Sequence, residues 1–299
     1  MTEHPPRIRV HAPSGALLIR DSLCIQLYLR RPHAEVAAGV LSALERYRSV
    51  VPTGGLSSYV EEAGDWEPVD AAGWNDIRNE LLEPHGAVLD LRDASGEKRY
   101  RFDYRGHRTE NRDTSDKVCA VSFWLPTEYL EEQGPDALRG LVLELAAPLP
   151  FSSGHAGLAF NCDLDLVGVE AEVLNWCRKY PGMDLPRMDR LAWRLGTNVS
   201  AVSWMTLLGE PVLSEAGGTV GLREQLRSAE GTVLDLGNER VAIVLAPAPE
   251  AGDAERGVVL PAYRKLASVL GPWLFHDQHL AGTSPTEAEL RRWERRFLE

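Results

Sequence analysis

VLDLRDASGEKRYRFDY, residues 88–104, is the stretch of sequence that decides the fold class. Two runs in which apolar and polar residues alternate, 88–91 and 100–104, flank Ser95-Gly96. Alternation with a period of two is typical of a β-strand, and a short glycine-containing turn between two such runs is typical of a hairpin. The stretch therefore predicts two antiparallel strands.

The rest of the sequence combines further strand patterns with helical patterns. A second hairpin is predicted at 232–245 with its turn at Gly237-Asn238, and strand-like alternation also occurs at 23–29. Because the predicted strands come in pairs with helices between them, we predict an α+β fold with antiparallel sheets and flanking helices. Two packed α/β subdomains are one arrangement that this pattern allows. The same pattern disfavours a doubly wound parallel sheet. Apolar residues recur with helical spacing in 36–47, 74–81, 138–145, 169–180, 222–226 and 263–273, and further extended segments are predicted at 118–124, 156–160 and 199–207.

Three parts are predicted along the chain. Residues 1–16 are expected to be a flexible arm, residues 17–283 the main domain, and residues 284–299 a C-terminal amphipathic helix. The charged stretch 106–117 is the most weakly packed connection within the main domain. A subdomain boundary is therefore predicted there.

The C-terminal helix has a clear start and a clear apolar face. Ser284 and Glu287 have the spacing of a capping box, which fixes the first turn of a helix. Leu290, Trp293 and Phe297 occupy positions i, i+3 and i+7. Such residues share one side of a helix, so we predict that this helix docks through them.

Composition excludes several classes of protein. The 299 residues include 32 Lys plus Arg against 44 Asp plus Glu, a net charge of −12, whereas nucleic-acid binding needs clustered positive charge. The N-terminus lacks the apolar core of a secretory signal, and the longest apolar stretch, 141–151, is too short to span a bilayer. The four cysteines lie far apart without a C-x-x-C pair. We therefore expect a cytoplasmic protein that binds neither nucleic acid nor membrane.

A search for catalytic motifs gives one weak candidate. Ser153 and His155 could be a nucleophile beside a base, with Asp163 as the acid. The segment lacks the G-x-S-x-G elbow of many hydrolases, so a structural role is favoured. Asp163 and Asp165 could bind a cation as a pair, but spacing places no third ligand beside them. We predict no catalytic residue, cofactor or metal, and keep a hydrolase that uses Ser153, His155 and Asp163 as the alternative.

Charge is distributed unevenly along the chain. Segment 61–93 holds ten acidic and two basic residues, a net charge of −8, and a run of basic residues follows at 98–112. The polar part 57–70 has no clear helical or strand period, and such loops often carry binding function. Acidic side chains accelerate the capture of a basic protein, and a tryptophan can anchor the complex. The alternative is a solvated acidic face around one buried tryptophan. The predicted partner-binding residues are Glu61, Glu62, Asp65, Trp66 and Glu67.

Several blocks of sequence resemble one bacterial family. They are Tyr129–Pro135 (YLEEQGP), Pro150–Asn161 (PFSSGHAGLAFN) and Tyr180–Asp184 (YPGMD). With these blocks, the chain from about residue 17 to about residue 275 resembles the type VI secretion immunity protein family.

The resemblance implies a non-enzymatic antidote. Such a protein binds a toxin that the cell injects into competitors and so prevents self-intoxication. The family is often associated with nuclease toxins, and a nuclease needs a basic surface to hold phosphate, so the expected partner is a toxin with such a surface. No toxin-contacting residue is transferred, because no motif defines one. The hydrolase described above and an adaptor that loads cargo onto a secretion apparatus remain alternatives.

Overall fold

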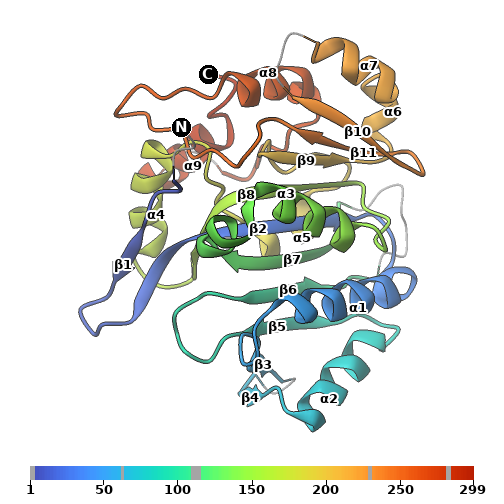
Figure 1. The fold of residues 1–299 in the computed structure, drawn as a ribbon, viewed down its shortest axis with the longest axis vertical. Helices are drawn as coiled ribbons and strands as arrows, with labels where there is room; N and C mark the ends of the chain where they lie inside the picture. Colours follow the sequence, from blue (N-terminus) through green and yellow to red (C-terminus); the bar gives the residue numbers. More distant parts are fainter. Residues whose placement is uncertain (1–3, 62–63, 109–115, 228–230, 281–283) are drawn as a thin grey trace. The chain divides into compact units, whose positions relative to one another are not determined.

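A computed structural model describes residues 4–61, 64–108, 116–227, 231–280 and 284–299, which form two compact units (Figure 1). Unit 1 consists of residues 1–21, 153–186 and 197–299, and unit 2 consists of residues 22–152 and 187–196. Segment 106–117, where the sequence predicted a subdomain boundary, falls within unit 2, and its residues 109–115 lie outside the described part. The division of the chain into an arm, a main domain and a terminal helix stays a prediction.

Unit 2 is built on an antiparallel sheet. Its strand order is β2-β7-β6-β5-β3-β4, and residues 22–29 of β2 belong to this unit. The hairpin predicted around Ser95-Gly96 is confirmed as β5 and β6, and the predicted α+β class with antiparallel strands is confirmed as well. The strands are β2 (Leu17–Leu29), β7 (Cys119–Pro126), β6 (Arg101–Arg105), β5 (Val88–Arg92), β3 (Ser58–Val60) and β4 (Trp66–Pro68).

The segment predicted as a loop at 57–70 contains a small hairpin instead. Here β3 and β4 pair antiparallel, with Ser58 opposite Pro68 and Val60 opposite Trp66. Three-residue strands are too short to show a period in the sequence, which is why alternation did not reveal them. The hairpin places β4 at the end of the strand order of unit 2.

The two faces of this sheet differ in chemistry. Phe102 and Phe123 are buried on one face, where Tyr47 of α1 packs edge-on against Phe123 with ring centroids 5.4 Å apart. Asp90 and Asp103 lie opposite each other on the other face, because side chains alternate along a strand. We call this second face, with Asp90, Arg92, Arg101, Asp103, Arg105 and Ser122, the polar face. The helices of unit 2 are α1 (His33–Val50), α2 (Ala71–Leu82), α3 (Thr127–Ala146) and α5 (Met188–Arg194).

Unit 1 has its own antiparallel strands, in the order β10-β11-β9-β8. The hairpin predicted with its turn at Gly237-Asn238 is confirmed as β10 and β11. Residues 9–11, which the sequence placed in the flexible arm, form β1 and pair with the first residues of β2. Ile8 is buried beside them, so this part of the arm belongs to the sheet. The remaining elements are β1 (Arg9–His11), β8 (Ser153–Cys162), β9 (Met205–Leu208), β10 (Thr232–Gly237), β11 (Arg240–Val244), α4 (Val169–Lys179), α6 (Val212–Glu215), α7 (Gly218–Gln225), α8 (Pro261–Leu270), the 3-10 helix η1 (Gly271–Trp273) and α9 (Pro285–Glu294).

The last helix, α9, is shorter than the predicted span 284–299 and ends at Glu294, so Phe297 lies beyond it. The Ser284 hydroxyl accepts a hydrogen bond from the backbone N–H of Glu287 at 3.2 Å, which confirms the predicted cap. Leu290, Trp293 and Phe297 are all buried. Among the described residues, no helix is both long and apolar enough to cross a membrane.

Trp293→Ala should lower the free energy of unfolding by about 3 kcal/mol, because it deletes a large buried ring and leaves a cavity. Chemical denaturation of the full-length chain measures this loss. Leu298→Ala is the matched control, since Leu298 lies on the same terminal segment but is 37% exposed and should change stability little. Equal stabilities for wild type and Trp293→Ala would contradict the docked position of α9.

Candidate functional site

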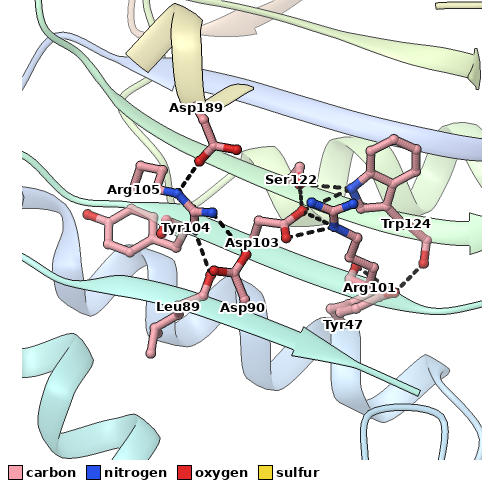
Figure 2. A network of polar contacts seen from close by, with 10 residues as sticks. All are labelled: Tyr47, Leu89, Asp90, Arg101, Asp103, Tyr104, Arg105, Ser122, Trp124 and Asp189. Atoms are coloured by element: carbon pink, nitrogen blue, oxygen red, sulfur yellow. Dashed lines mark hydrogen bonds and ion pairs between the residues drawn. The ribbon is translucent and has the colours of Figure 1, made fainter. Parts of the chain in front are cut away.

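A buried carboxylate organises the polar face of unit 2 (Figure 2). Asp103 on β6 has a side chain that is only 2% exposed. It accepts hydrogen bonds from Arg101 Nε at 2.7 and 2.8 Å, from Ser122 Oγ at 2.7 Å and from Trp124 Nε1 at 3.2 Å. Burial alone would raise the pKa of Asp103, but the charge of Arg101, a hydrogen bond with Asp90 and the charges of Arg92 and Arg105 hold it below its ordinary value.

A second carboxylate on the same face behaves differently. Asp90 on β5 lies 2.9 Å from Arg105 Nη2, and Arg105 Nε forms an ion pair with Asp189 on α5. Burial, reinforced by the charge of Asp103, raises the pKa of Asp90 to about 6. Figure 2 shows how these side chains connect β5, β6 and α5.

This network contains the residue types of an acid–base catalytic site, but its central carboxylate, Asp103, is buried as in a structural cluster. Two carboxyl groups with unlike pKa values are what enzymes use for acid–base catalysis. Asp103, however, is enclosed by donors from β6 and β7, so a substrate cannot reach it. The network instead fixes the register of β5, β6 and β7 and holds α5 on the polar face.

A second buried polar cluster lies in unit 1, around His155 on β8. His155 Nε2 lies 2.8 Å from Asp184 Oδ2, and His155 Nδ1 lies 3.1 Å from the Ser200 hydroxyl. Arg296 Nη2 lies 3.6 Å from Asp184 Oδ1, while its Nε–H donates to the Pro181 carbonyl at 2.8 Å. The cluster therefore ties the block 181–184 to β8 and to the C-terminal segment.

The trio Ser153, His155 and Asp163 does not form the arrangement that the hydrolase alternative requires. The Ser153 hydroxyl donates to the Asn198 carbonyl at 3.2 Å, and the carboxylate beside His155 is Asp184. Asp163 lies just beyond the end of β8. Sequence reasoning missed Asp184 and Ser200 because 29 and 45 residues separate them from His155.

Ser200, His155 and Asp184 have the residue types of a hydrolase triad, but two of them are buried. Burial would raise the pKa of Asp184, yet the charge and hydrogen bond of His155, helped by Arg296, lower it overall. The carboxylate thus lies beside the Arg296 guanidinium as well as the His155 ring. We interpret the cluster as a structural cross-link of unit 1.

The predicted partner-binding segment lies at the tip and outer strand of the β3–β4 hairpin. Its turn is closed by hydrogen bonds from Glu61 N–H to the Asp65 carbonyl and from Gly64 N–H to the Glu61 carbonyl, at 3.0 and 2.9 Å. Trp66 is 49% exposed, so the alternative that it is a core residue is wrong. The Arg92 guanidinium lies 5.4 Å from its ring centroid. Glu62 lies outside the described residues.

The side chains that could bind a metal ion are scattered over the described part of the chain. No group of three or more His, Cys, Asp or Glu side chains there is arranged to hold a metal ion. Cys24, Cys119, Cys162 and Cys177 are all buried free thiols.

Comparison with known proteins identifies the family. A family model described as type VI immunity for VRR-NUC (TsiV) matches residues 39–297, so the chain belongs to this family of immunity proteins. A solved structure, the T6SS protein PA0821 of Pseudomonas aeruginosa, shares the fold with a TM-score of 0.77 at 21% sequence identity. The match covers 98% of this chain and 88% of that chain. Comparison with curated proteins gives no match. The resemblance seen in the sequence is thereby confirmed, and the protein acts in type VI immunity.

Substitution of the two carboxylates of the polar face should lower stability to different extents and with different dependence on pH. Asp103→Asn should cost roughly 3 to 5 kcal/mol at neutral pH, because it leaves the Arg101 charge buried without its partner. Asp90→Asn should cost less. The raised pKa of Asp90 means that wild type loses stability as pH rises from about 4 through about 6, and an asparagine does not titrate.

Denaturation at pH 4.5 and pH 7.5 measures both effects. The stability of Asp90→Asn relative to wild type should be higher at pH 7.5 than at pH 4.5. If both variants lost the same free energy at both pH values, the assignment of unlike roles to Asp90 and Asp103 would be wrong.

Proposed function

We propose that this immunity protein neutralises a VRR-NUC toxin by binding it through the β3–β4 hairpin, without any chemical step. The observation that carries the proposal is the 49% exposure of Trp66 within a hairpin whose charged residues, 61–67, are all acidic. Exposed tryptophans are rare on a monomer surface and are enriched among the residues that dominate binding energy.

Charge supports the same choice of partner. A toxin that cleaves nucleic acid needs a basic surface to hold phosphate, and such a surface is attracted by Glu61, Asp65 and Glu67. Glu62 completes the set predicted from the sequence. With a net charge of −12, the whole chain adds a long-range field of the same sign.

The burial of the polar clusters supports a non-enzymatic role. The groups that resemble catalytic residues, His155 with Asp184 and Asp103 with Asp90, are held by neighbouring side chains and stabilise the fold. We further propose that the protein works in the cytoplasm of the producing cell, where nucleic acid needs protection. No cofactor is required for this role.

Reversing the described hairpin acids, Glu61→Lys, Asp65→Lys and Glu67→Lys together, should slow association with the purified cognate toxin. The defect should shrink as salt rises, since exposed charges are screened beyond roughly 10 Å at 0.1 M salt. Trp66→Ala should instead accelerate dissociation by about tenfold or more, because loss of an anchoring ring acts on complex lifetime. Surface plasmon resonance at two salt concentrations gives both rate constants.

The matched control carries the same change of charge on α3 of the same unit, with Glu131→Lys, Glu132→Lys and Asp136→Lys. It should slow association much less than the hairpin reversal. Equal defects in the two triple variants, together with an unchanged lifetime for Trp66→Ala, would place the interface elsewhere.

Ser200→Ala should protect toxin-expressing cells as well as wild type does. The substitution removes the only hydroxyl that a Ser200–His155–Asp184 triad could use as nucleophile, and it leaves the His155–Asp184 pair in place. Growth of the cells is the readout, and a thermal melt of the purified variant verifies folding. Loss of protection by a well-folded Ser200→Ala protein would support the hydrolase alternative.

A further inference from the structure

The polar face of unit 2 exposes more apolar surface than the hairpin alone. In the described part of unit 2, four large apolar side chains are exposed, and three of them belong to this face: Trp66 at 49%, Val88 at 56% and Trp193 at 53%. The fourth, Leu82, is 49% exposed at the end of α2. Exposed apolar groups gathered on one face of a protein usually mark an interaction site.

Strand register places Trp66 and Val88 on the same side of the sheet. Trp66 is opposite Val60 on β3, and Ser58, two residues before Val60, is opposite Arg92 on β5. Val88 lies four residues before Arg92 on β5 and opposite Arg105 on β6, so its side chain points to the polar face as well. From strand spacing and rise, the Trp66 and Val88 backbones are roughly 12 Å apart.

Helix α5 brings Trp193 to this face. Asp189 of α5 pairs with Arg105, whose side chain belongs to the polar face. The Trp193 ring lies 4.6 Å from the His107 ring, centroid to centroid, and Lys117 Nζ lies 4.6 Å from the Trp193 centroid.

The two ends of the surface carry opposite charge. The charged residues of the hairpin, 61–67, are acidic and have Arg92 beside them on Trp66, whereas the α5 end holds Lys117, Arg190 and Arg194 with Asp116 beside them. The one acid of α5, Asp189, is paired with Arg105. A uniformly basic partner would be attracted at the hairpin and repelled at α5.

We propose that Trp66, Val88 and Trp193 mark one docking surface for the toxin, and that the toxin presents basic residues to the hairpin and acidic residues to α5. This inference rests on the proposed function and adds the extent and polarity of the interface. Aromatic residues with arginines between them have the composition of an interface core. A standard interface buries about 800 Å² per partner, a patch on the order of 30 Å across, which is wider than the roughly 12 Å between the Trp66 and Val88 backbones.

Kinetics with the purified cognate toxin test the extent of this surface. Trp193→Ala should accelerate dissociation by about tenfold or more, and Val88→Ser by a smaller factor. Val220→Ser is the matched control: Val220 is 67% exposed on α7 of unit 1, outside the unit that carries the proposed surface, and its variant should keep the wild-type lifetime. Thermal melts of the full-length variants verify that each one folds.

The sign of the charge effect tests the polarity of the surface. Lys117→Glu combined with Arg190→Glu makes the α5 end acidic. Association with the toxin should slow, because the toxin's acidic residues would then be repelled. Faster association would mean that the toxin is basic there too, and would overturn the proposed polarity.

The outcomes separate this inference from the proposed function. Wild-type lifetimes for Trp193→Ala and Val88→Ser beside a shortened lifetime for Trp66→Ala would overturn the extended surface and leave the hairpin interface standing. Failure of the wild-type chain to bind the toxin would overturn the proposed function itself. Tryptophan quenching by a DNA oligonucleotide that disappears in Trp193→Ala would assign the α5 end to nucleic acid and overturn the toxin as its occupant.

Discussion

The structure of unit 2 depends on a buried negative charge. An isolated carboxylate is expensive to bury, and Asp103 can be buried only because Arg101, Ser122 and Trp124 all donate to it. Those donors come from β6 and β7, so the charge is satisfied in one register of the two strands and in no other. A slip by one residue would turn Asp103 towards the apolar face that packs on α1.

The same constraint has a consequence for function. Arg105 links β6 to β5 through Asp90 and to α5 through Asp189, which sets α5 on the polar face. The position of Trp193 on that face therefore follows from this ion pair together with the backbone hydrogen bond from Val118 N–H to the Ala192 carbonyl. In unit 1, Asp184 plays a comparable part, because it contacts both His155 and Arg296. The residues that resemble a catalytic triad connect β8 to the block 181–184 and to the C-terminal segment.

Local sequence patterns predicted much of the fold. Alternation predicted the β5–β6 and β10–β11 hairpins, helical spacing predicted α1 and α4, and the Ser284 cap predicted the start of α9. These features depend on residues close together in the chain. Patterns of this kind failed for β1, β3 and β4, whose three residues are too few to show a period.

The candidate surface could be predicted only in part. Trp66 stood out because it lies within a run of acids, and that signal is local. Val88 and Trp193 gave no such signal, since their common face arises from strand pairing and from an ion pair between residues 84 positions apart. The contacts of Asp184 and Ser200 with His155 were missed for the same reason. A contact between residues that lie far apart in the chain leaves no local pattern in the sequence.

The central claim is that the protein inhibits its toxin by contact through the polar face, while its buried polar clusters serve the fold. Hydroxyl-radical footprinting of the free and toxin-bound chain tests it most directly, because exposed tryptophans oxidise readily. Oxidation of Trp66 and Trp193 should fall strongly on binding, while that of Trp176 on α4 of unit 1 should stay the same. Equal oxidation of Trp66 and Trp193 in the free and bound chain would contradict the account.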